Sequence, residues 1–186
     1  MTTALVVLVA GVIGGGYFFL RMSQTQYYIG ADSTGELVVY HGINYSVLGI
    51  SLSSPSERTG IMRDQVPQNY QETVTPSGSA GGRSQVLTAV ATVRTAVNEC
   101  KSAYLAQAQW VTIDNAYTKY QAAVAANKRK HPPASIASLG QAPPKPGQRP
   151  LPEGQLPSSA GGGQCPQPGA FHIQPGTLTP TAPGSS

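Results

Sequence analysis

SQTQYYIG, residues 23–30, decides the expected fold because it follows directly on an apolar run at residues 4–20. Those upstream residues include no charged side chain, and a run of this length is at the short end of what spans a hydrocarbon core. Residues 26–30 are rich in Tyr and Ile, which predicts an extended strand. The junction therefore predicts a single-pass membrane protein in which the first strand begins at the membrane surface.

A cleaved signal peptide is the alternative interpretation of the apolar run. Such a peptide has a basic region before the run and small residues at its cleavage site. Here no Lys or Arg precedes residue 4, and the bulky sequence YFFLR occupies residues 17–21. We therefore expect an uncleaved transmembrane helix at residues 4–20. Charge specifies its orientation poorly, because Arg21 is the only nearby basic residue and by itself favours a cytoplasmic C-terminal part.

Residues 24–74 are expected to form a small β-rich segment. Strand candidates at residues 26–30 and 37–42 flank the turn sequence DSTG at residues 32–35, which predicts a β-hairpin. A third extended piece, residues 46–52, would complete three strands. Since an isolated hairpin is only marginally stable in water, a third strand or a covering helix is required.

A long helix is the expected cover for this segment. After a Gly/Ser-rich hinge at residues 75–83, apolar residues recur at the three- and four-residue spacing of one helix face. Two stripes follow this spacing: Val86, Val90, Val93, Val97, Cys100 and Tyr104, and then Trp110, Ile113, Tyr117, Tyr120 and Val124. The two stripes are out of step, which suggests a stutter, a bend or a helical hairpin. Residues 84–127 are therefore predicted to form a long helix or a helical hairpin. This helix either packs on the hairpin or pairs with a partner helix.

The C-terminal part of the chain, residues 131–186, is rich in Pro, Gly and Ser and poor in apolar residues. Proline prevents regular helix formation, and too few apolar residues remain to form a core. The sequence therefore predicts a disordered, partly polyproline-like tail. The complete fold prediction is a membrane-anchored α+β unit with a short hairpin or three strands, a long α-helix and this tail.

The chain has two cysteines, Cys100 and Cys165. In an oxidising compartment such a pair would tend to form a disulfide, whereas in the cytosol both would stay as thiols. A disulfide closing a loop of this length would stabilise the fold by about 4 kcal/mol in the chain-entropy model. Both states are open at this point. The sequence has no CxxC motif and no Cys/His cluster, so we expect no zinc site.

The sequence contains no recognisable catalytic constellation. Isolated aspartates and histidines occupy turn, loop, helix, strand-end and tail positions: Asp32, Asp64, Asp114, His41, His131 and His172. No spacing places an acid beside a base, so we expect no catalytic, cofactor-binding or metal-binding residues. The net charge of +4 is modest. Aromatic residues do not interleave with a basic stripe, which excludes nucleic-acid binding.

Three short segments carry a family resemblance: residues 25–30, 39–43 and 49–52. The residues on which it rests are Gln26, Tyr27, Tyr28, Gly30, Gly42 and Gly49. They resemble the extracytoplasmic C-terminal part of actinobacterial membrane-anchored protein phosphatases of the PP2C type. The resemblance covers the apolar run and the β-rich segment after it. His41 departs from the pattern, because the family more often has Arg before this Gly.

The resemblance implies a catalytic domain inside the cell, then the membrane span and an extracytoplasmic segment. The parent phosphatases use Mn²⁺ or Mg²⁺ held on aspartates, but their catalytic domain is absent from this sequence. The expected function of the chain is therefore that of a non-catalytic extracytoplasmic sensor or docking segment at the cell membrane, with a cell-wall polymer or an envelope protein as partner. The alternatives are an unrelated single-pass envelope structural protein with an oligomerising helix, and a fragment of a full protein phosphatase whose catalytic domain lies before Met1.

Overall fold

The computed structural model describes residues 25–47, 49–130, 139–152, 155–159, 161–174 and 178. The chain divides into two compact units, Met1–Ala96 and Val97–Ser186, which we call the sheet unit and the tail unit. Helix α2 (Arg83–Lys130) contributes its first part to the sheet unit and its remainder to the tail unit.

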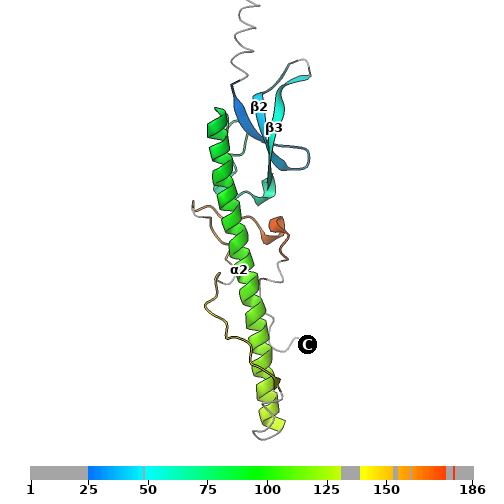
Figure 1. Ribbon diagram of the computed structural model, residues 1–186, viewed down its shortest axis with the longest axis vertical. Coiled ribbons are helices and arrows are strands. Elements are labelled where there is room, and N and C mark those ends of the chain that lie inside the picture. The colour runs from blue at the N-terminus through cyan, green and yellow to red at the C-terminus, as the bar shows by residue number, and fades with distance from the viewer. Residues whose placement is uncertain are drawn as a thin grey trace, which may run out of the picture. The chain divides into compact units, whose positions relative to one another are not determined.

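The sheet unit contains a three-stranded antiparallel sheet in the order β1-β2-β3 (Figure 1). Its strands are β1 (Tyr27–Ala31), β2 (Glu36–Val47) and β3 (Ile50–Met62). The Gly35 N–H closes the turn between β1 and β2 by donating to the Asp32 carbonyl at 3.0 Å. The extended piece expected at residues 46–52 is not one strand, because β2 ends at Val47 and β3 begins at Ile50. Ser46 and Ser51 are instead cross-strand partners, and β3 continues through a serine-rich stretch to Met62.

Both faces of the sheet are buried at its centre. Tyr28 and Ile29 point to opposite faces because side chains alternate along a strand, yet both are at most 6% exposed. The same holds for Val38 and Val39 on β2. The other buried apolar residues come from β2, the end of β3, the segment after it and the first part of α2: Leu37, Ile61, Val66, Pro67, Val74, Val86, Val90, Val93 and Ala96.

The segment before α2 closes the outer edge of β1. Tyr27 and Gly81 exchange two backbone hydrogen bonds, at 2.8 and 3.0 Å. The hydroxyl of Ser79 accepts a hydrogen bond from the Ile29 N–H at 2.7 Å. The buried strand edge is therefore satisfied without a fourth strand. This closing segment lies within residues 75–83, where the sequence predicts a hinge.

Helix α2 runs without interruption from Arg83 to Lys130, and one buried face follows its middle part. In the tail unit, Cys100, Tyr104, Gln107 and Val111 are all at most 3% exposed. Their spacing of four, three and four residues is that of one helix face. Gln107 is polar, so the apolar pattern in the sequence is interrupted at this position. The buried face of the helix nevertheless continues through it, because Gln107 is buried as well.

The prediction of a disordered tail is wrong for the described part of residues 131–186. Cys165 and Phe171 are buried there, and residues Pro168–Phe171 form a short 3-10 helix, η4. The Phe171 ring lies against that of Tyr104 on α2, with centroids 6.0 Å apart. A segment with few apolar residues of its own is thus ordered by an apolar helix face elsewhere in the chain.

The expected fold class of a single-pass membrane protein is also wrong. Across the residues that the structure describes, no helix is long and apolar enough to cross a membrane. These residues form a small α+β fold of three strands and one long helix. The predictions of a membrane anchor and of a cell-membrane location are corrected with it. The apolar run on which they depended, residues 4–20, lies outside the described residues.

Candidate functional site

Four of the residues that carry the family resemblance meet at one end of β1 and β2. Gln26, Tyr27, Tyr28 and Gly42 line a small cavity of about 160 Å³. The other lining residues are Ile43, Asn44, Pro76, Ser77 and Ala80. The cavity is therefore built from two neighbouring strands and the loop before α2, all within the sheet unit.

Gly42 sets the backbone geometry of this cavity. Its φ is +110°, a conformation that residues with a side chain rarely adopt. Its N–H donates to the Gln26 carbonyl at 2.8 Å. A Cβ atom on Gly42 would collide with the carbonyl oxygen of Leu52 on β3. Glycine is thus required where β2 passes between Gln26 and β3.

Two of the lining residues, Tyr27 and Tyr28, form aromatic pairs with residues of β2, one pair on each face of the sheet. Tyr28 and Tyr40 stack with ring centroids 5.2 Å apart and an interplanar angle of 12°. Tyr28 Oη also donates to Ser53 Oγ at 2.7 Å, which fixes the orientation of the ring. Because side chains alternate along a strand, Tyr27 and His41 form their pair on the opposite face, with centroids 4.8 Å apart.

The two other glycines of the resemblance do not line the cavity. Gly30 lies under the ring of Tyr40, where a Cβ atom would come within 3.2 Å of the ring. Gly49 lies in the turn between β2 and β3 with φ of +82°, and nothing lies within 4 Å of a Cβ built there. Gly30 therefore makes room for a ring, whereas Gly49 serves the turn conformation.

A second hollow of about 480 Å³ shares Asn44 with the cavity. Tyr45, Ser46 and Ser51 complete its lining, and Tyr45 is 67% exposed. We call the lining residues of the cavity and the hollow together the hairpin surface. None of them carries a charge at neutral pH.

Asp32 has a structural position in the turn between β1 and β2. Its Oδ1 accepts hydrogen bonds from Thr34 Oγ1 at 2.6 Å and from Thr34 N at 2.8 Å. Its Oδ2 pairs with Arg58 Nη1 at 3.0 Å, and Arg58 also pairs with Glu36 at 2.6 Å. The Thr34 hydroxyl, followed by the Thr34 N–H, lowers the pKa of Asp32 below its ordinary value.

The partners of Asp32 include neither Asp64 nor Asp114. Asp64 lines a different hollow of about 450 Å³ beside Gly35 and Met62. Asp114 lies on the part of α2 that belongs to the tail unit. His131 lies outside the described residues. Among the residues that the structure does describe, no three His, Cys, Asp or Glu side chains are grouped so that they could hold a metal ion.

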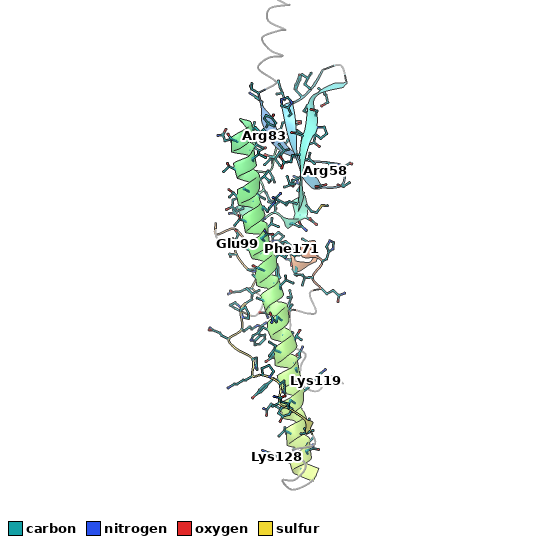
Figure 2. The ribbon with its side chains drawn as sticks, in the orientation of Figure 1. Arg58, Arg83, Glu99, Lys119, Lys128 and Phe171 are labelled. Atoms are coloured by element: carbon teal, nitrogen blue, oxygen red, sulfur yellow. A yellow bond between two sulfur atoms is a disulfide. The ribbon has the colours of Figure 1, made fainter. Side chains whose placement is uncertain are left out.

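A disulfide joins Cys100 and Cys165 in the tail unit, with Cα atoms 5.6 Å apart across a sequence separation of 65. Both residues are buried. Next to this link, Tyr104 Oη donates to the Pro166 carbonyl at 2.8 Å, and burial raises the pKa of Tyr104. Phe171 lies beside α2 (Figure 2). The link fastens the part of the tail around Cys165 to the buried helix face.

Sequence reasoning missed Asn44 and Tyr45 as candidate site residues. The sequence NYS at residues 44–46 matches a glycosylation sequon, a short pattern that often occurs by chance. Nothing in that pattern indicates that the end of β2 presents Asn44 beside Gln26. The proximity arises from the antiparallel pairing of β1 with β2, which only the fold reveals.

No protein-family model, no curated protein and no solved structure matches this chain. The resemblance to PP2C-type phosphatases is therefore still a prediction from the quoted residues.

Proposed function

We propose that the chain is a non-catalytic docking module whose hairpin surface binds an uncharged, hydroxyl-rich polymer of the polysaccharide class. The observation that carries the proposal is the cavity at which Gln26, Tyr27 and Asn44 meet. Asn44 also lines the adjoining hollow with the exposed Tyr45, so one continuous set of residues offers both a recess and an aromatic ring.

The absence of charge on the hairpin surface selects the class of ligand. A surface without charged side chains offers no counter-charge to a phosphate, a carboxylate or an ammonium group. Asp32 and Glu36 lie outside this surface, and both carboxylates are paired with Arg58. An uncharged ligand that binds through hydrogen bonds and ring contacts therefore fits this surface best.

Sugars match the side chains of the hairpin surface in two ways. Sugar hydroxyls both donate and accept hydrogen bonds, as do the side-chain amides of Gln26 and Asn44 and the hydroxyls of Ser46 and Ser51. The C–H face of a sugar ring packs on an aromatic ring, and Tyr45 is exposed for such a contact. Each class of side chain on the surface thus has a partner on a saccharide.

The size of the cavity favours a polymer over a free small molecule. Pockets that enclose drug-sized ligands typically have roughly 300–1,000 Å³. The cavity of about 160 Å³ is smaller, so it accommodates one sugar unit or one substituent. Further units of a chain would then lie along the adjoining hollow at Tyr45 and Ser51.

The framework of the hairpin surface is fixed before a ligand arrives. Gly42 holds β2 against Gln26, and the Tyr28 hydroxyl holds Ser53. A preorganised surface loses less conformational entropy on binding than a mobile one. In this proposal the resemblance to PP2C-type phosphatases concerns origin: the chain would be the docking part of such an enzyme, and Mn²⁺- or Mg²⁺-dependent catalysis would belong to another domain.

Co-sedimentation of the full chain with insoluble chitin, cellulose and starch, three uncharged polysaccharides, tests this function. We expect retention on at least one polymer, with little change between low and high salt because no ion pair is involved. Tyr45→Ala and Asn44→Ala each remove an exposed contact and should weaken retention about fivefold, as expected for one ring contact or one hydrogen bond.

Leu105→Ala is the matched control, because Leu105 is also a large exposed apolar residue, 51% exposed, but lies in the tail unit. This variant should be retained like the unmodified chain. No retention on any of the three polymers, or retention that Tyr45→Ala leaves unchanged, would contradict the proposal.

A further inference from the structure

The part of α2 that belongs to the tail unit presents a row of side-chain donors to the tail. Tyr104 Oη, Gln107 Nε2 and Trp110 Nε1 are spaced three residues apart along the helix. They donate to the backbone carbonyls of Pro166, Leu178 and Gly147, at 2.8, 3.1 and 2.8 Å. Besides the disulfide and the buried contacts, the helix thus binds the tail through main-chain carbonyl groups, which every sequence offers.

The segment at Trp110 is rich in proline. Residues 141–152 read QAPPKPGQRPLP, and we call them the proline segment. An extended proline-rich chain has no internal hydrogen bonds, so its carbonyls are available to donors from outside. Domains that recognise such chains use an aromatic-lined groove, and an indole N–H is a suitable donor there.

Two further contacts fix the proline segment on α2. The Leu151 N–H donates to Gln107 Oε1 at 3.2 Å, so the Gln107 amide donates to one part of the tail and accepts from another. The Arg149 guanidinium lies over the Trp110 ring, 5.6 Å from its centroid, which is a cation–π contact. Gln107 and Trp110 therefore form hydrogen bonds with the backbone of the segment, and Trp110 also contacts one of its basic side chains.

The proline segment is held less firmly than the tail beyond it. No residue from 139 to 152 is buried, whereas Pro157, Ser159, Cys165 and Phe171 all are. The disulfide fastens the later part covalently. A segment with few buried contacts opens locally at a small cost in free energy. The face at Trp110 can therefore become vacant while the link at Cys165 stays closed.

We propose that the face formed by Gln107 and Trp110 is a binding site for a polyproline-II segment of a partner protein, filled in the free chain by its own proline segment. The tethered segment acts as an intramolecular competitor, whose effective concentration is in the millimolar range for a short tether. A partner segment therefore binds only if its own concentration and affinity outweigh those of the tethered segment, or while the tethered segment is detached from α2. This site is independent of the hairpin surface, since every residue that forms it belongs to the tail unit.

A labelled synthetic peptide with the sequence QAPPKPGQRPLP tests the site by fluorescence anisotropy. The full chain should bind it weakly. A variant in which residues 141–152 are replaced by Gly and Ser at the same length has no competitor, and it should bind the peptide at least tenfold more tightly. In that variant Trp110→Phe keeps the ring but removes the indole donor, and should weaken binding about fivefold. A peptide with Ala at every Pro should not bind.

Tyr117→Phe is the matched control on the same helix, because Tyr117 makes none of these contacts, and it should leave binding unchanged. Equal affinity of the full chain and the replacement variant, or no effect of Trp110→Phe, would overturn the proposal. A concentration-dependent dimer of the unmodified chain, lost in the replacement variant, would assign the site to a second copy and would also overturn it.

Hydrogen exchange provides a test that does not require the replacement variant to fold. In the otherwise unmodified chain, Trp110→Phe should increase exchange of the Leu151 amide, which donates to Gln107, and leave exchange of the Cys165 amide unchanged. Unchanged protection of Leu151 would show that Trp110 does not hold the proline segment, and would contradict the proposal.

Discussion

At the residue scale, Gly42 is a position at which both the backbone conformation and a close neighbour oppose a side chain. Gly42→Ala would place a Cβ against the Leu52 carbonyl in a conformation with φ of +110°. We expect a loss of about 2–4 kcal/mol in the free energy of unfolding, from backbone strain together with overpacking. Urea denaturation followed by circular dichroism measures this loss.

Gly49→Ala is the control for Gly42→Ala, because its φ is also positive, at +82°, but no atom lies within 4 Å of the added Cβ. Only the conformational strain remains, so the expected loss is about 1 kcal/mol. Equal losses for the two variants would show that contact with Leu52 does not limit this position.

Asp32 makes the stability of the sheet unit depend on pH. Because hydrogen bonds from Thr34 lower its pKa in the native state below the ordinary 3.8, the ionised form stabilises the fold. This contribution is fully present well above pH 3.8 and is lost as the pH falls through the native pKa. Asp32→Asn should therefore lower the urea midpoint at neutral pH and have little effect at about pH 2. A pH-independent effect of Asp32→Asn would contradict the assignment.

Single residues also show where the sequence is informative. The turn at Asp32 and Gly35 can be predicted, because Asp accepts local hydrogen bonds and Gly adopts positive φ. The burial of Gln107 cannot be predicted, because its partners at Leu151 and Leu178 are distant in sequence. The site residue Asn44 was missed for a similar reason, since strand pairing brings it to Gln26.

At the element scale, the disulfide fastens the tail to α2. Replacing both Cys100 and Cys165 by Ala should destabilise the tail unit by about 4 kcal/mol, the chain-entropy value for a loop of this length. Hydrogen exchange should then rise at Ile173 and His172, whose amides are bonded within the tail. Amides in β1 and β2 should keep their protection, because both strands lie outside the closed loop in sequence.

Reduction of the unmodified chain should reproduce the effect of the double replacement. Unchanged exchange of the tail in both experiments would show that the contacts of Tyr104 and Phe171 hold it without the covalent link.

Elements differ in how far the sequence specifies them. β1 and the first half of β2 are rich in Tyr, Val and Ile, which favour strands. β3 contains Ser, Pro and Gly, and it is a strand because it pairs with β2. The tail has no periodic pattern at all, and its order comes from burial against α2. Local composition therefore predicts elements that contribute their own apolar residues and misses those that depend on a distant partner.

At the scale of the whole molecule, the account requires that the chain itself performs no phosphoester hydrolysis. The purified chain should not turn over p-nitrophenyl phosphate or a phosphothreonine peptide, with or without Mn²⁺, because Asp32 is engaged with Thr34 and Arg58 rather than grouped with other metal ligands. Metal-dependent turnover that Asp32→Ala or Asp64→Ala abolishes would overturn the non-catalytic assignment.

Binding of a saccharide at the hairpin surface is the central claim, and NMR titration of the ¹⁵N-labelled full chain tests it most directly. A soluble oligosaccharide from the retained polymer should shift the side-chain amide signals of Gln26 and Asn44 in a saturable manner. Signals of the Gln107 side chain in the tail unit should stay in place. Saturable shifts confined to the tail unit, or no saturable shift with any oligosaccharide of the three polymers, would contradict the account.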